Sequence, residues 1–326
     1  MPHLSIVTPC YNEEANVGDL YGQVRAVLES LPGYTYEHIF IDNASTDATV
    51  ARLRELVAQD SRVRIIVNAR NFGHIRSPYY ALLQGLGDAV ILLAADLQDP
   101  PPVIAEFVRK WEEGFKIVAG VKTRSEEARL MYAIRSLYYR MVSALSGMNL
   151  LMHFTGFGLY DKRVIEVLRS IEDPYPYLRG LVSEIGFDVA TVPFTQPRRK
   201  RGKTSNNFYS LYDMAMLGIT SHSKVPLRVA SMGGFLASAL SAFVGFCYFV
   251  GKLLFWNKFE LGLAPAVVGL FLMSSALLFF IGILGEYISV IHTHVRRLPL
   301  VVERERVNFE ADRKGSLAKP CAPPPP

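Results

Sequence analysis

The chain has few cysteines, only three in 326 residues. Cys10, Cys247 and Cys321 lie too far apart to suggest a disulfide framework or a metal cluster, and the seven histidines lack ligand spacing as well. No Gly-x-Gly-x-x-Gly follows an expected strand. The run Arg201-Gly202-Lys203-Thr204 resembles the end of a P-loop, but Pro197 stands where the first glycine is required. These absences exclude disulfide-rich domains, zinc-type centres and two common nucleotide-binding motifs.

Two long segments have no charged residue. They are 229–251, with 23 residues, and 261–285, with 25. Each is long enough to cross the hydrocarbon core of a bilayer, and the short connector 252–260 makes the pair a helical hairpin. A pair of buried core helices is the alternative. Fully apolar helices of this length are rare in soluble domains, so the sequence favours two membrane spans.

Basic residues flank the outer ends of this hairpin. Those outside the spans are Lys224, Arg228, Arg296, Arg297, Arg304 and Arg306, and those in the connector are Lys252 and Lys258. By the positive-inside rule, we expect a multi-pass protein of the cell (inner) membrane with both termini and the catalytic part in the cytoplasm. Leu4–Val7 is too short an apolar core for a signal peptide, so we expect none.

The formal net charge of +5 favours anionic partners. No aromatic and basic RNA-binding signature is present, so we expect no nucleic-acid partner. A membrane surface is the expected partner instead.

The first 200 residues alternate strand and helix patterns. Expected strands are Leu4–Thr8, His38–Asp42, Val63–Val67, Val90–Ala94 and Ile117–Val121, and expected helices are Glu13–Leu31, Thr46–Ala58, His74–Leu86, Val103–Glu113, Glu126–Gly147 and Asp161–Ser170. This rhythm predicts an α/β fold with a mostly parallel, Rossmann-like sheet and helices on both faces.

The rest of the chain divides by composition. A basic loop at 196–205 precedes an amphipathic helix at 208–220 that we expect to lie on the membrane, and the polar tail after Arg306 should be disordered towards its end. The expected organisation is a cytoplasmic catalytic domain at 1–205, an interfacial region at 206–228, two transmembrane helices within 229–291 and a cytoplasmic tail at 292–326.

The segment 91–101 is the most informative in the chain. It runs from an apolar strand into Asp96, Gln98 and Asp99, and prolines follow. In an extended segment, Asp96 and Gln98 would point the same way and offer two oxygens to one hard cation such as Mg²⁺ or Mn²⁺. The alternative is a polar turn that begins a helix, with Asp99 as its N-cap.

Two further expected strands also end in polar residues. The first ends in Thr8-Pro9-Cys10-Tyr11-Asn12-Glu13-Glu14 and the second in Ile41-Asp42-Asn43-Ala44-Ser45-Thr46-Asp47. Each alone could be a turn with capping residues. Together with segment 91–101 they predict a nucleotide cleft, because the carboxyl ends of parallel strands share one edge of the sheet.

The chain resembles the family 2 glycosyltransferases of the GT-A fold. It is most similar to the polyprenyl-phosphate glycosyltransferases, the group of dolichol-phosphate mannose synthase and the bacterial undecaprenyl-phosphate glucosyltransferases. The residues that carry the resemblance are Pro9-Cys10-Tyr11-Asn12-Glu13, Asp42 with Ser45-Thr46-Asp47, Arg70-Asn71-Phe72-Gly73, Asp96-Leu97-Gln98-Asp99-Pro100-Pro101, and Gly218-Ile219-Thr220-Ser221 with Ser223 and Pro226-Leu227-Arg228.

The resemblance implies roles for individual residues on the donor side. Residues expected to bind the nucleotide sugar are Pro9, Tyr11, Glu13, Asp42, Arg70 and Asp96, with Glu13 near the ribose and Asp42 at the base. Asp96 and Gln98 are expected to hold Mg²⁺ or Mn²⁺ against the diphosphate.

The basic run around residue 200 corresponds to a loop that receives the lipid phosphate, through Arg198, Arg201 and Thr204. Guanidinium groups suit phosphate oxygens. The alternative is a solvated loop resting on anionic lipid headgroups. The relatives also suggest a homo-oligomer, such as a tetramer.

The chain departs from the family at two places. Ala94 stands where the family usually has an acid, two residues before Asp96. The family also often has Gly-Asp-Phe-Arg before a Leu-x-Asp; here Gly156 stands at the Asp of that motif and Gly158 at its Arg. Neither change forbids catalysis, because a phosphate monoester is largely ionised at neutral pH and needs little help from a base. We therefore expect a single inverting displacement, with Asp96, Asp99 and Arg201 as the catalytic candidates and Asp99 as the nearest alternative acid.

The leading hypothesis is transfer of one sugar, with UDP-glucose favoured as donor, to polyprenyl (undecaprenyl) phosphate. One alternative is a processive polysaccharide synthase, but neither Trp111 nor Trp256 ends the Gln-x-x-Arg-Trp motif of those enzymes. Another is a catalytically degenerate membrane subunit that binds a nucleotide sugar without turnover, which the departures at Ala94 and Gly156 motivate.

Overall fold

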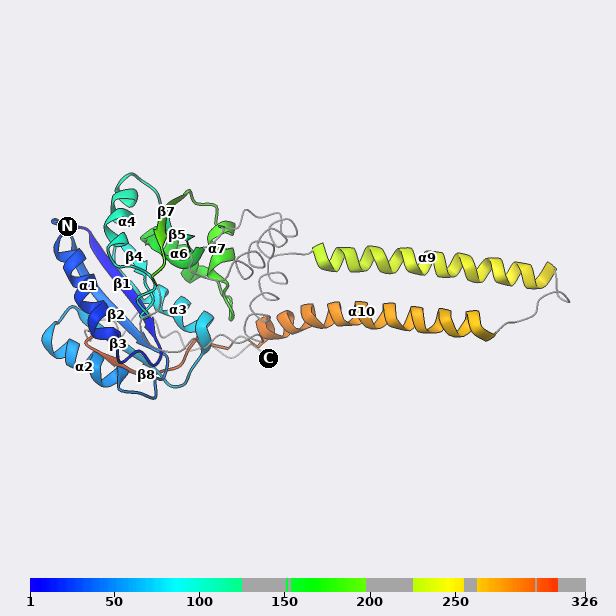
Figure 1. Cartoon of the computed structure of the whole chain (residues 1–326), viewed down its shortest axis with the longest axis horizontal. Coiled ribbons are helices and arrows are strands. Elements are labelled where there is room, and N and C mark those ends of the chain that lie inside the picture. The colour runs from blue at the N-terminus through cyan, green and yellow to red at the C-terminus, as the bar shows by residue number, and fades with distance from the viewer. Residues whose placement is uncertain (125–150, 152–153, 198–224, 255–262, 297, 310–326) are drawn as a thin grey trace, which may run out of the picture. The chain divides into compact units, whose positions relative to one another are not determined.

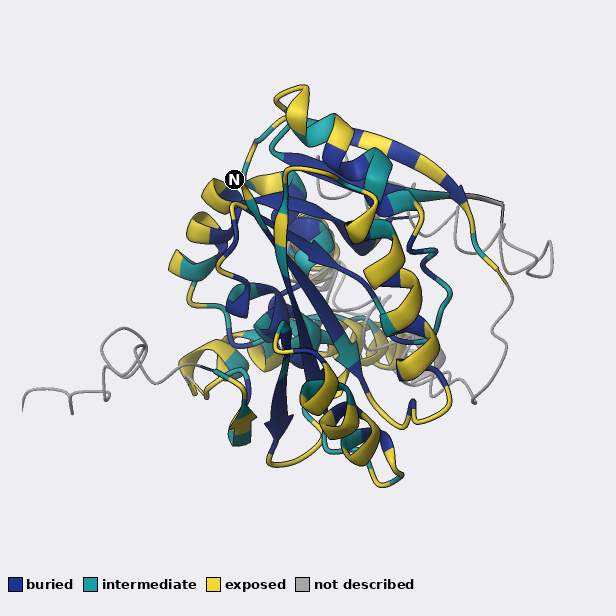
Figure 2. Cartoon of the chain, turned by 90° about the vertical axis from the view of Figure 1, so that its left-hand side faces the viewer, coloured by how far each residue is buried: buried dark blue, intermediate teal, exposed yellow. Residues whose placement is uncertain are grey.

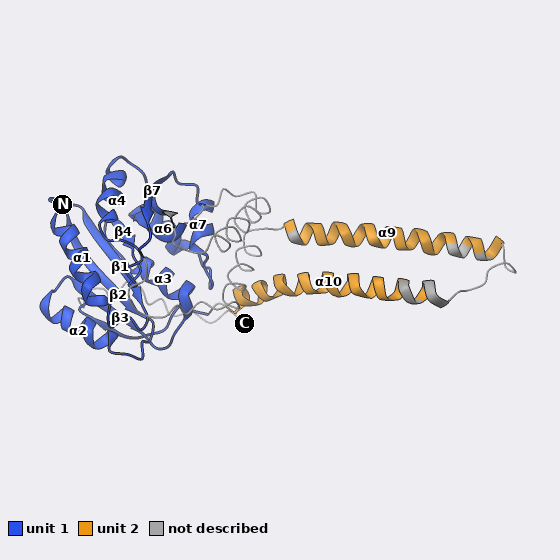
Figure 3. Cartoon of the chain, in the orientation of Figure 1, with its two compact units in different colours: residues 1–128, 151–204, 298–326 blue, residues 129–150, 205–297 orange. Residues whose placement is uncertain are grey.

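The computed structural model describes residues 1–124, 151, 154–197, 225–254, 263–296 and 298–309. The chain divides into two compact units, which are coloured separately in Figure 3. Unit 1 comprises residues 1–128, 151–204 and 298–326, and unit 2 comprises 129–150 and 205–297. The predicted helices at 126–147 and 208–220, and the tail beyond residue 309, lie outside the described residues.

The described part of unit 1 is an eight-stranded sheet with helices between its strands (Figure 1). The strands are β1 His3–Cys10, β2 Thr35–Asp42, β3 Val63–Asn68, β4 Ala89–Leu92, β5 Ile117–Arg124, β6 Phe154–Asp161, β7 Val189–Thr195 and β8 Glu303–Val307. The helices are α1 Val17–Glu29, α2 Thr49–Gln59, α3 Gly73–Gln84, α4 Val103–Glu112, α6 Lys162–Ser170 and α7 Leu178–Glu184.

The strand order is β7-β5-β6-β4-β1-β2-β3-β8. Strands β3, β2, β1 and β4 are parallel to their neighbours in that set, and β5 is parallel to β7. Strand β6 is antiparallel to β4 and β5, and β8 is antiparallel to β3. The predicted α/β class with a mostly parallel sheet is therefore confirmed.

Three strands were not predicted from the sequence. Strand β7 alternates exposed and buried residues, a period-two signal that could have identified it. Strand β6 contains two glycines, and β8 has the charged sequence Glu-Arg-Glu-Arg-Val, so neither has the usual strand composition. Strand β8 lies in a segment that the sequence had suggested was tail, yet it forms one edge of the sheet.

The sheet is covered on both faces, because successive side chains of a strand point to opposite sides. Leu4 and Ile6 of β1 pack in one hydrophobic cluster with α1, α2 and α4. Val7 packs in a second cluster with α3, α6 and α7. Figure 2 shows the buried strands lying between helices with exposed outer faces.

Strand β6 approaches β5 so closely that a side chain has no room. A Cβ added at Gly158 would lie 2.5 Å from the carbonyl oxygen of Val118, which is backbone and cannot move aside cheaply. Gly156 has a φ of +102°, a conformation that L-residues rarely adopt. Both glycines are therefore required by the geometry of β6.

Unit 2 contains the helices α9, Val225–Leu254, and α10, Leu263–Val295. Stretches Leu227–Cys247 and Gly269–Val295 are long and apolar enough to cross a membrane. A core helix of a soluble protein would be mostly buried, whereas only 6% and 0% of their most apolar windows are buried. The helices pack together at Gly233, where an added Cβ would lie 3.3 Å from the ring of Phe280. The two apolar helices therefore form a candidate transmembrane hairpin.

Replacement of Gly158 by alanine should destabilise the protein, because the new methyl group collides with the Val118 carbonyl. We expect a loss of about 1–3 kcal/mol, the usual cost of overpacking. The matched control is Gly22→Ala in α1, where nothing lies within 4 Å. That change should be neutral or stabilise by up to about 1 kcal/mol, because alanine favours a helix. Thermal unfolding of the purified wild type and both variants is the measurement. A melting temperature of Gly158→Ala equal to that of the wild type would contradict the role assigned to Gly158.

Candidate active site

The strand order changes direction between β1 and β4, because β2 and β3 follow β1 on one side while β4 lies on the other. In open α/β sheets, ligands bind outside the carboxyl ends of the strands at such a switch point. The register brings those ends together, since Cys10 pairs with Asp42 and Asp42 pairs with Val67. Polar segments 11–16, 42–49, 68–73 and 94–99 leave the sheet along this edge (Figure 1).

The turns after β1 and β2 are tied to each other. The backbone N–H of Asn12 donates to Ser45 Oγ at 2.9 Å, and the backbone N–H of Thr46 donates to Asn12 Oδ1 at 2.8 Å. The backbone N–H of Glu13 donates to Thr49 Oγ1, also at 2.9 Å. Asn12 and Ala44 both have left-handed backbone, with φ of 55° and 61°. These crossed bonds hold two strained turns in one arrangement.

The structure brings the predicted nucleoside residues to this edge. Tyr11 is 38% exposed, and Pro9 is partly buried at the end of β1. Glu13 is buried, and its carboxylate accepts a 2.6 Å hydrogen bond from Asn16 Nδ2. Tyr11 therefore offers an accessible ring at this edge of the sheet, whereas Glu13 is engaged at the start of α1.

Asp42 is fully buried at the end of β2. Its Oδ2 accepts a hydrogen bond of 2.9 Å from the backbone N–H of Ser45, while Oδ1 has no partner among the described residues. Burial raises the pKa of this carboxyl above its usual value, and the hydrogen bond from Ser45 opposes the shift. A buried acceptor without a donor is costly, so Oδ1 is well suited to accept the N–H group of a ligand.

Asp96 and Gln98 lie in a turn and not in the extended segment that the sequence suggested. Leu97 between them is left-handed, with φ of 58°, and the backbone N–H of Gln98 donates to Asp96 Oδ1 at 3.1 Å. The premise that the two side chains point the same way because the chain is extended was therefore wrong. Both side chains are partly exposed in this turn. Their assignment as metal ligands stays a prediction.

Asp99 is buried beside this turn. Burial and the charge of Asp96 raise its pKa to about 7, while the charge of Lys122 opposes the shift. The backbone N–H of Ala94 approaches Asp99 Oδ2 at 3.4 Å. The N-cap of α4 is Pro102, so the alternative of Asp99 as a helix cap does not hold.

Among the residues that the structure describes, no group of three or more His, Cys, Asp or Glu side chains is arranged to hold a metal ion. Asp96 and Asp99 nevertheless place two carboxylates close together, and the charge of one disfavours ionisation of the other. Hard divalent cations are commonly held by one or two carboxylates together with substrate phosphates. The donor set of Asp96, Gln98 and Asp99 fits Mg²⁺ or Mn²⁺ in that manner.

An amide network joins the ends of β2 and β3. Asn43 Nδ2 donates to Asn71 Oδ1 at 2.9 Å, and Asn43 Oδ1 accepts from the backbone N–H of Phe72 at 2.9 Å. Asn68 Nδ2 also donates to Asn43 Oδ1, at 3.2 Å. Arg70, an expected nucleotide-binding residue, stacks on the ring of Phe72 at 4.2 Å. The network fixes the turn that carries Arg70.

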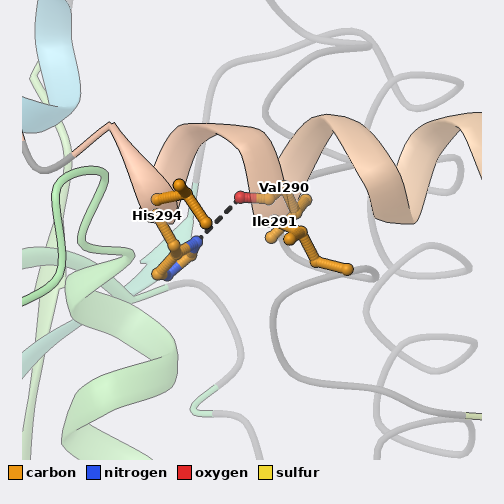
Figure 4. Close-up of a pocket in the computed structure, with 4 residues that line it drawn as sticks. Val290, Ile291 and His294 are labelled. Atoms are coloured by element: carbon orange, nitrogen blue, oxygen red, sulfur yellow. Dashed lines mark hydrogen bonds between the residues drawn. The ribbon is translucent and has the colours of Figure 1, made fainter.

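The expected acceptor residues Arg198, Arg201 and Thr204 lie outside the described residues. Figure 4 shows a pocket lined by Val290, Ile291, His294 and Val295 of α10. It belongs to unit 2, whereas the strand-end residues belong to unit 1, so it is not the expected nucleotide cleft.

Two features of the site were not predicted from the sequence. The charge of Lys122, on β5, lowers the pKa of Asp99, but no motif near Lys122 indicates this role. Asn43 and Asn71 stood inside motifs already singled out, and their side-chain bonds across the turns gave no signal in a single sequence.

Comparison with known proteins gives similarity to glycosyltransferases. Residues 5–169 match the family described as Glycosyl transferase family 2. The chain is 32% identical over 313 residues to the uncharacterized glycosyltransferase YkcC of Bacillus subtilis (strain 168), covering 95% of each chain. It is 30% identical over 297 residues to the SfII prophage-derived bactoprenol glucosyl transferase of Shigella flexneri, covering 91% of this chain and 96% of that one.

A solved structure shares the fold. It is glucosyl-3-phosphoglycerate synthase from Mycobacterium tuberculosis in complex with Mn²⁺, uridine diphosphate and glucosyl-3-phosphoglycerate. The TM-score is 0.50 at 20% identity, covering 69% of this chain and 81% of that one.

The ionisation of Asp99 makes the stability of the protein depend on pH. The pKa of Asp99 is about 7 in the folded protein, compared with 3.8 for an ordinary aspartate, the value taken for the unfolded chain. Ionisation of Asp99 therefore lowers the free energy of unfolding as the pH rises above 4, and the loss grows up to about pH 7. Asp99→Asn should therefore raise the melting temperature at pH 8 in metal-free buffer, and the gain should shrink towards pH 4. Thermal unfolding of both proteins across this range, with EDTA present, is the measurement. A gain independent of pH would contradict the ionisation argument.

Proposed function

Because this chain belongs to glycosyl transferase family 2, we propose that it moves a single sugar from a nucleotide sugar to a polyprenyl phosphate in the membrane. The observation that carries the proposal is the 30% identity to a bactoprenol glucosyl transferase over 91% of this chain and 96% of that one. The similarity thus extends well beyond the 5–169 family match, into the chain that contains both apolar helices. The name of that relative, a bactoprenol glucosyl transferase, favours a bactoprenol (undecaprenyl) phosphate as acceptor and a glucosyl group as the sugar, and UDP-glucose is our candidate donor.

The path of the chain supports catalysis on one side of a membrane. Strands β1 to β7 precede the two apolar helices and β8 follows them, yet all eight belong to one sheet. If the helices span a bilayer, both ends of the hairpin must then lie on the same side. The arginines that follow α10 favour the cytoplasm as that side.

Different residues at the strand ends can contact different parts of the nucleotide sugar. Asp42 can accept a hydrogen bond from the base, Tyr11 can contact the nucleoside, and Arg70 can meet a phosphate oxygen. Mg²⁺ or Mn²⁺ held by Asp96 and Gln98 would neutralise the charge that develops on the leaving diphosphate. Asp99 lies next to these two residues, and its raised pKa would fall beside a bound cation.

The acceptor needs alignment more than activation. A phosphate monoester has a second pKa near 6, so its oxygen is already a nucleophile at neutral pH. The protein must then hold this oxygen in line with the anomeric carbon and the leaving group, which yields a single inverting displacement. Arg198, Arg201 and Thr204 are our candidates for holding the lipid phosphate, and Asp99 is the candidate acid or base nearest the diphosphate.

Transfer of radiolabelled sugar to a lipid-extractable product tests the proposal. The purified full chain is incubated with undecaprenyl phosphate, Mg²⁺ or Mn²⁺, and a panel of UDP- and GDP-sugars. We expect one labelled lipid from one donor, UDP-glucose, and no product with EDTA. Nucleotide binding without product from any donor would favour a binding subunit without turnover, the function that Ala94 motivates.

Asp96→Ala should reduce turnover by at least about a hundredfold, the scale seen when a main electrostatic stabiliser of a transition state is removed. The protein should stay folded and bound to membranes, because Asp96 is partly exposed and supports only its own turn. Asp19→Ala, an exposed carboxylate on α1, is the matched control and should keep full activity. Full activity of the Asp96 variant would remove the metal assignment.

Arg201→Ala should raise the KM for lipid phosphate and leave the KM for the nucleotide sugar nearly unchanged. A lost charged hydrogen bond is worth about 1.5–3 kcal/mol, so the expected increase is about tenfold or more. Arg52→Ala on α2, where the guanidinium is exposed and pairs with Glu55, is the control and should change neither constant. An unaltered acceptor KM in the Arg201 variant would contradict its role.

A further inference from the structure

Strand β8 and Val302, the residue before it, contact the chain on both sides of the β3–α3 turn: the residue just after β3, and the second half of α3. Before the turn, the backbone N–H of Ala69 donates to the carbonyl of Val302 at 2.8 Å. After it, the hydroxyl of Tyr80 on α3 donates to Glu303 Oε1 at 2.7 Å. Arg306 bonds Glu303 at 2.6 Å and donates to Gln84 of α3 at 2.7 Å. We call Val302, Glu303 and Arg306 the β8 clamp.

The clamp depends on an irregularity in the pairing of β8 with β3. Glu305 pairs with Val67, but the next pair joins Glu303 to Asn68, so Arg304 is an extra residue in β8. Such a bulge turns neighbouring side chains to different faces of a sheet. Glu305 accordingly pairs with Arg54 of α2 at 2.7 Å, on the face opposite to α3, where Glu303 lies.

The turn between β3 and α3 carries Arg70, an expected nucleotide-binding residue. Asn68, which pairs with Glu303, bonds Asn43 through its side chain. Asn43 in turn accepts from the backbone of Phe72, on which Arg70 stacks. A continuous series of contacts therefore joins β8 to Arg70.

We propose that the β8 clamp is a positioning element of the donor site, which fixes the β3–α3 turn for binding of the nucleoside diphosphate. The inference rests on the proposed function for the identity of the ligand. Val302, Glu303 and Arg306 are not themselves among the candidate nucleotide-binding residues. The clamp acts by holding Ala69 at the start of the turn and, through Tyr80 and Gln84, the helix α3 that follows it, so that the turn between them is ordered before the nucleotide arrives.

Glu303 and Glu305, two carboxylates of the same strand, differ in how closely they are held. The ion pair of Arg54 with Glu305 is 54% and 37% exposed, and such pairs contribute little to folding. Glu303 is better enclosed, with its side chain 20% exposed, and it accepts hydrogen bonds from Tyr80 and Arg306. Loss of the Glu303 carboxylate would remove its bond to Tyr80 and the support it gives to Arg306, which bonds Gln84, while the pair of Arg54 with Glu305 stays in place.

The test compares Glu303→Ala with the matched control Glu305→Ala in the full chain, purified in detergent. Titration calorimetry measures binding of UDP and, in parallel, GDP, each with Mn²⁺. We expect Glu303→Ala to weaken binding of the preferred nucleotide by about threefold to tenfold, the range found for couplings through neighbouring residues. Glu305→Ala should bind as the wild type does. Glu303→Gln, which still accepts from Tyr80 and Arg306, should recover most of the affinity.

Steady-state kinetics supplies the second readout. Glu303→Ala should raise the KM for the nucleotide sugar by the same factor and leave the KM for undecaprenyl phosphate unchanged. If this variant does not fold, Tyr80→Phe, which removes only the hydroxyl, decides the matter through the same shift in nucleotide affinity.

Three outcomes would overturn the proposal. They are unchanged nucleotide affinity in folded Glu303→Ala, equal weakening by Glu303→Ala and Glu305→Ala, and equal increases in both KM values. Wild-type protein that binds neither nucleotide would remove the proposed function together with the inference. Normal wild-type binding with an unaffected Glu303 variant would remove the inference alone.

Discussion

The parallel pairing of β1 with β2 and β4 is the constraint on which the site depends. It places Cys10 beside Asp42 and carries the chain after Leu92 to the same edge. Three turns then leave the sheet there. Each contains one non-glycine residue with left-handed backbone: Asn12 after β1, Ala44 after β2 and Leu97 after β4. Such backbone costs roughly 1–2 kcal/mol for an ordinary residue. Crossed hydrogen bonds hold the turns at Asn12 and Ala44, and the bond from the Gln98 N–H to Asp96 closes the turn at Leu97, so these backbones are fixed without a ligand.

Much of this arrangement could be predicted from one sequence. Apolar runs gave five strands, and polar residues at their ends gave the edge on which Tyr11, Asp42 and Asp96 lie. Those signals are local, and the class of the sheet follows from their alternation. The apolar helices were equally clear, although α10 continues to Val295, beyond the expected end of the second span at 285.

The remainder depended on contacts between distant segments. Nothing near Glu303 indicates that a charged pentapeptide pairs with β3, because the pairing partner lies more than two hundred residues away. At Leu97 the sequence left a turn open as the alternative, but nothing in it marks the left-handed backbone that a non-glycine residue adopts there. Gly156 and Gly158 were interpreted as losses of family residues, whereas φ at the first and the Val118 carbonyl at the second exclude larger side chains. In this chain, the family residues cannot be restored there without moving β6.

The place of β8 in the chain also has a consequence for biosynthesis. Translation completes β1 to β7 before either apolar helix, and β8 is made after both. Until then the outer edge of β3 has no partner, a state that invites association with other chains. A nascent chain can close this edge only if both ends of the hairpin emerge on the same face of the bilayer. If α9 and α10 span a bilayer, a chain inserted with its two hairpin ends on opposite faces could not complete the sheet, and the edge of β3 would stay exposed.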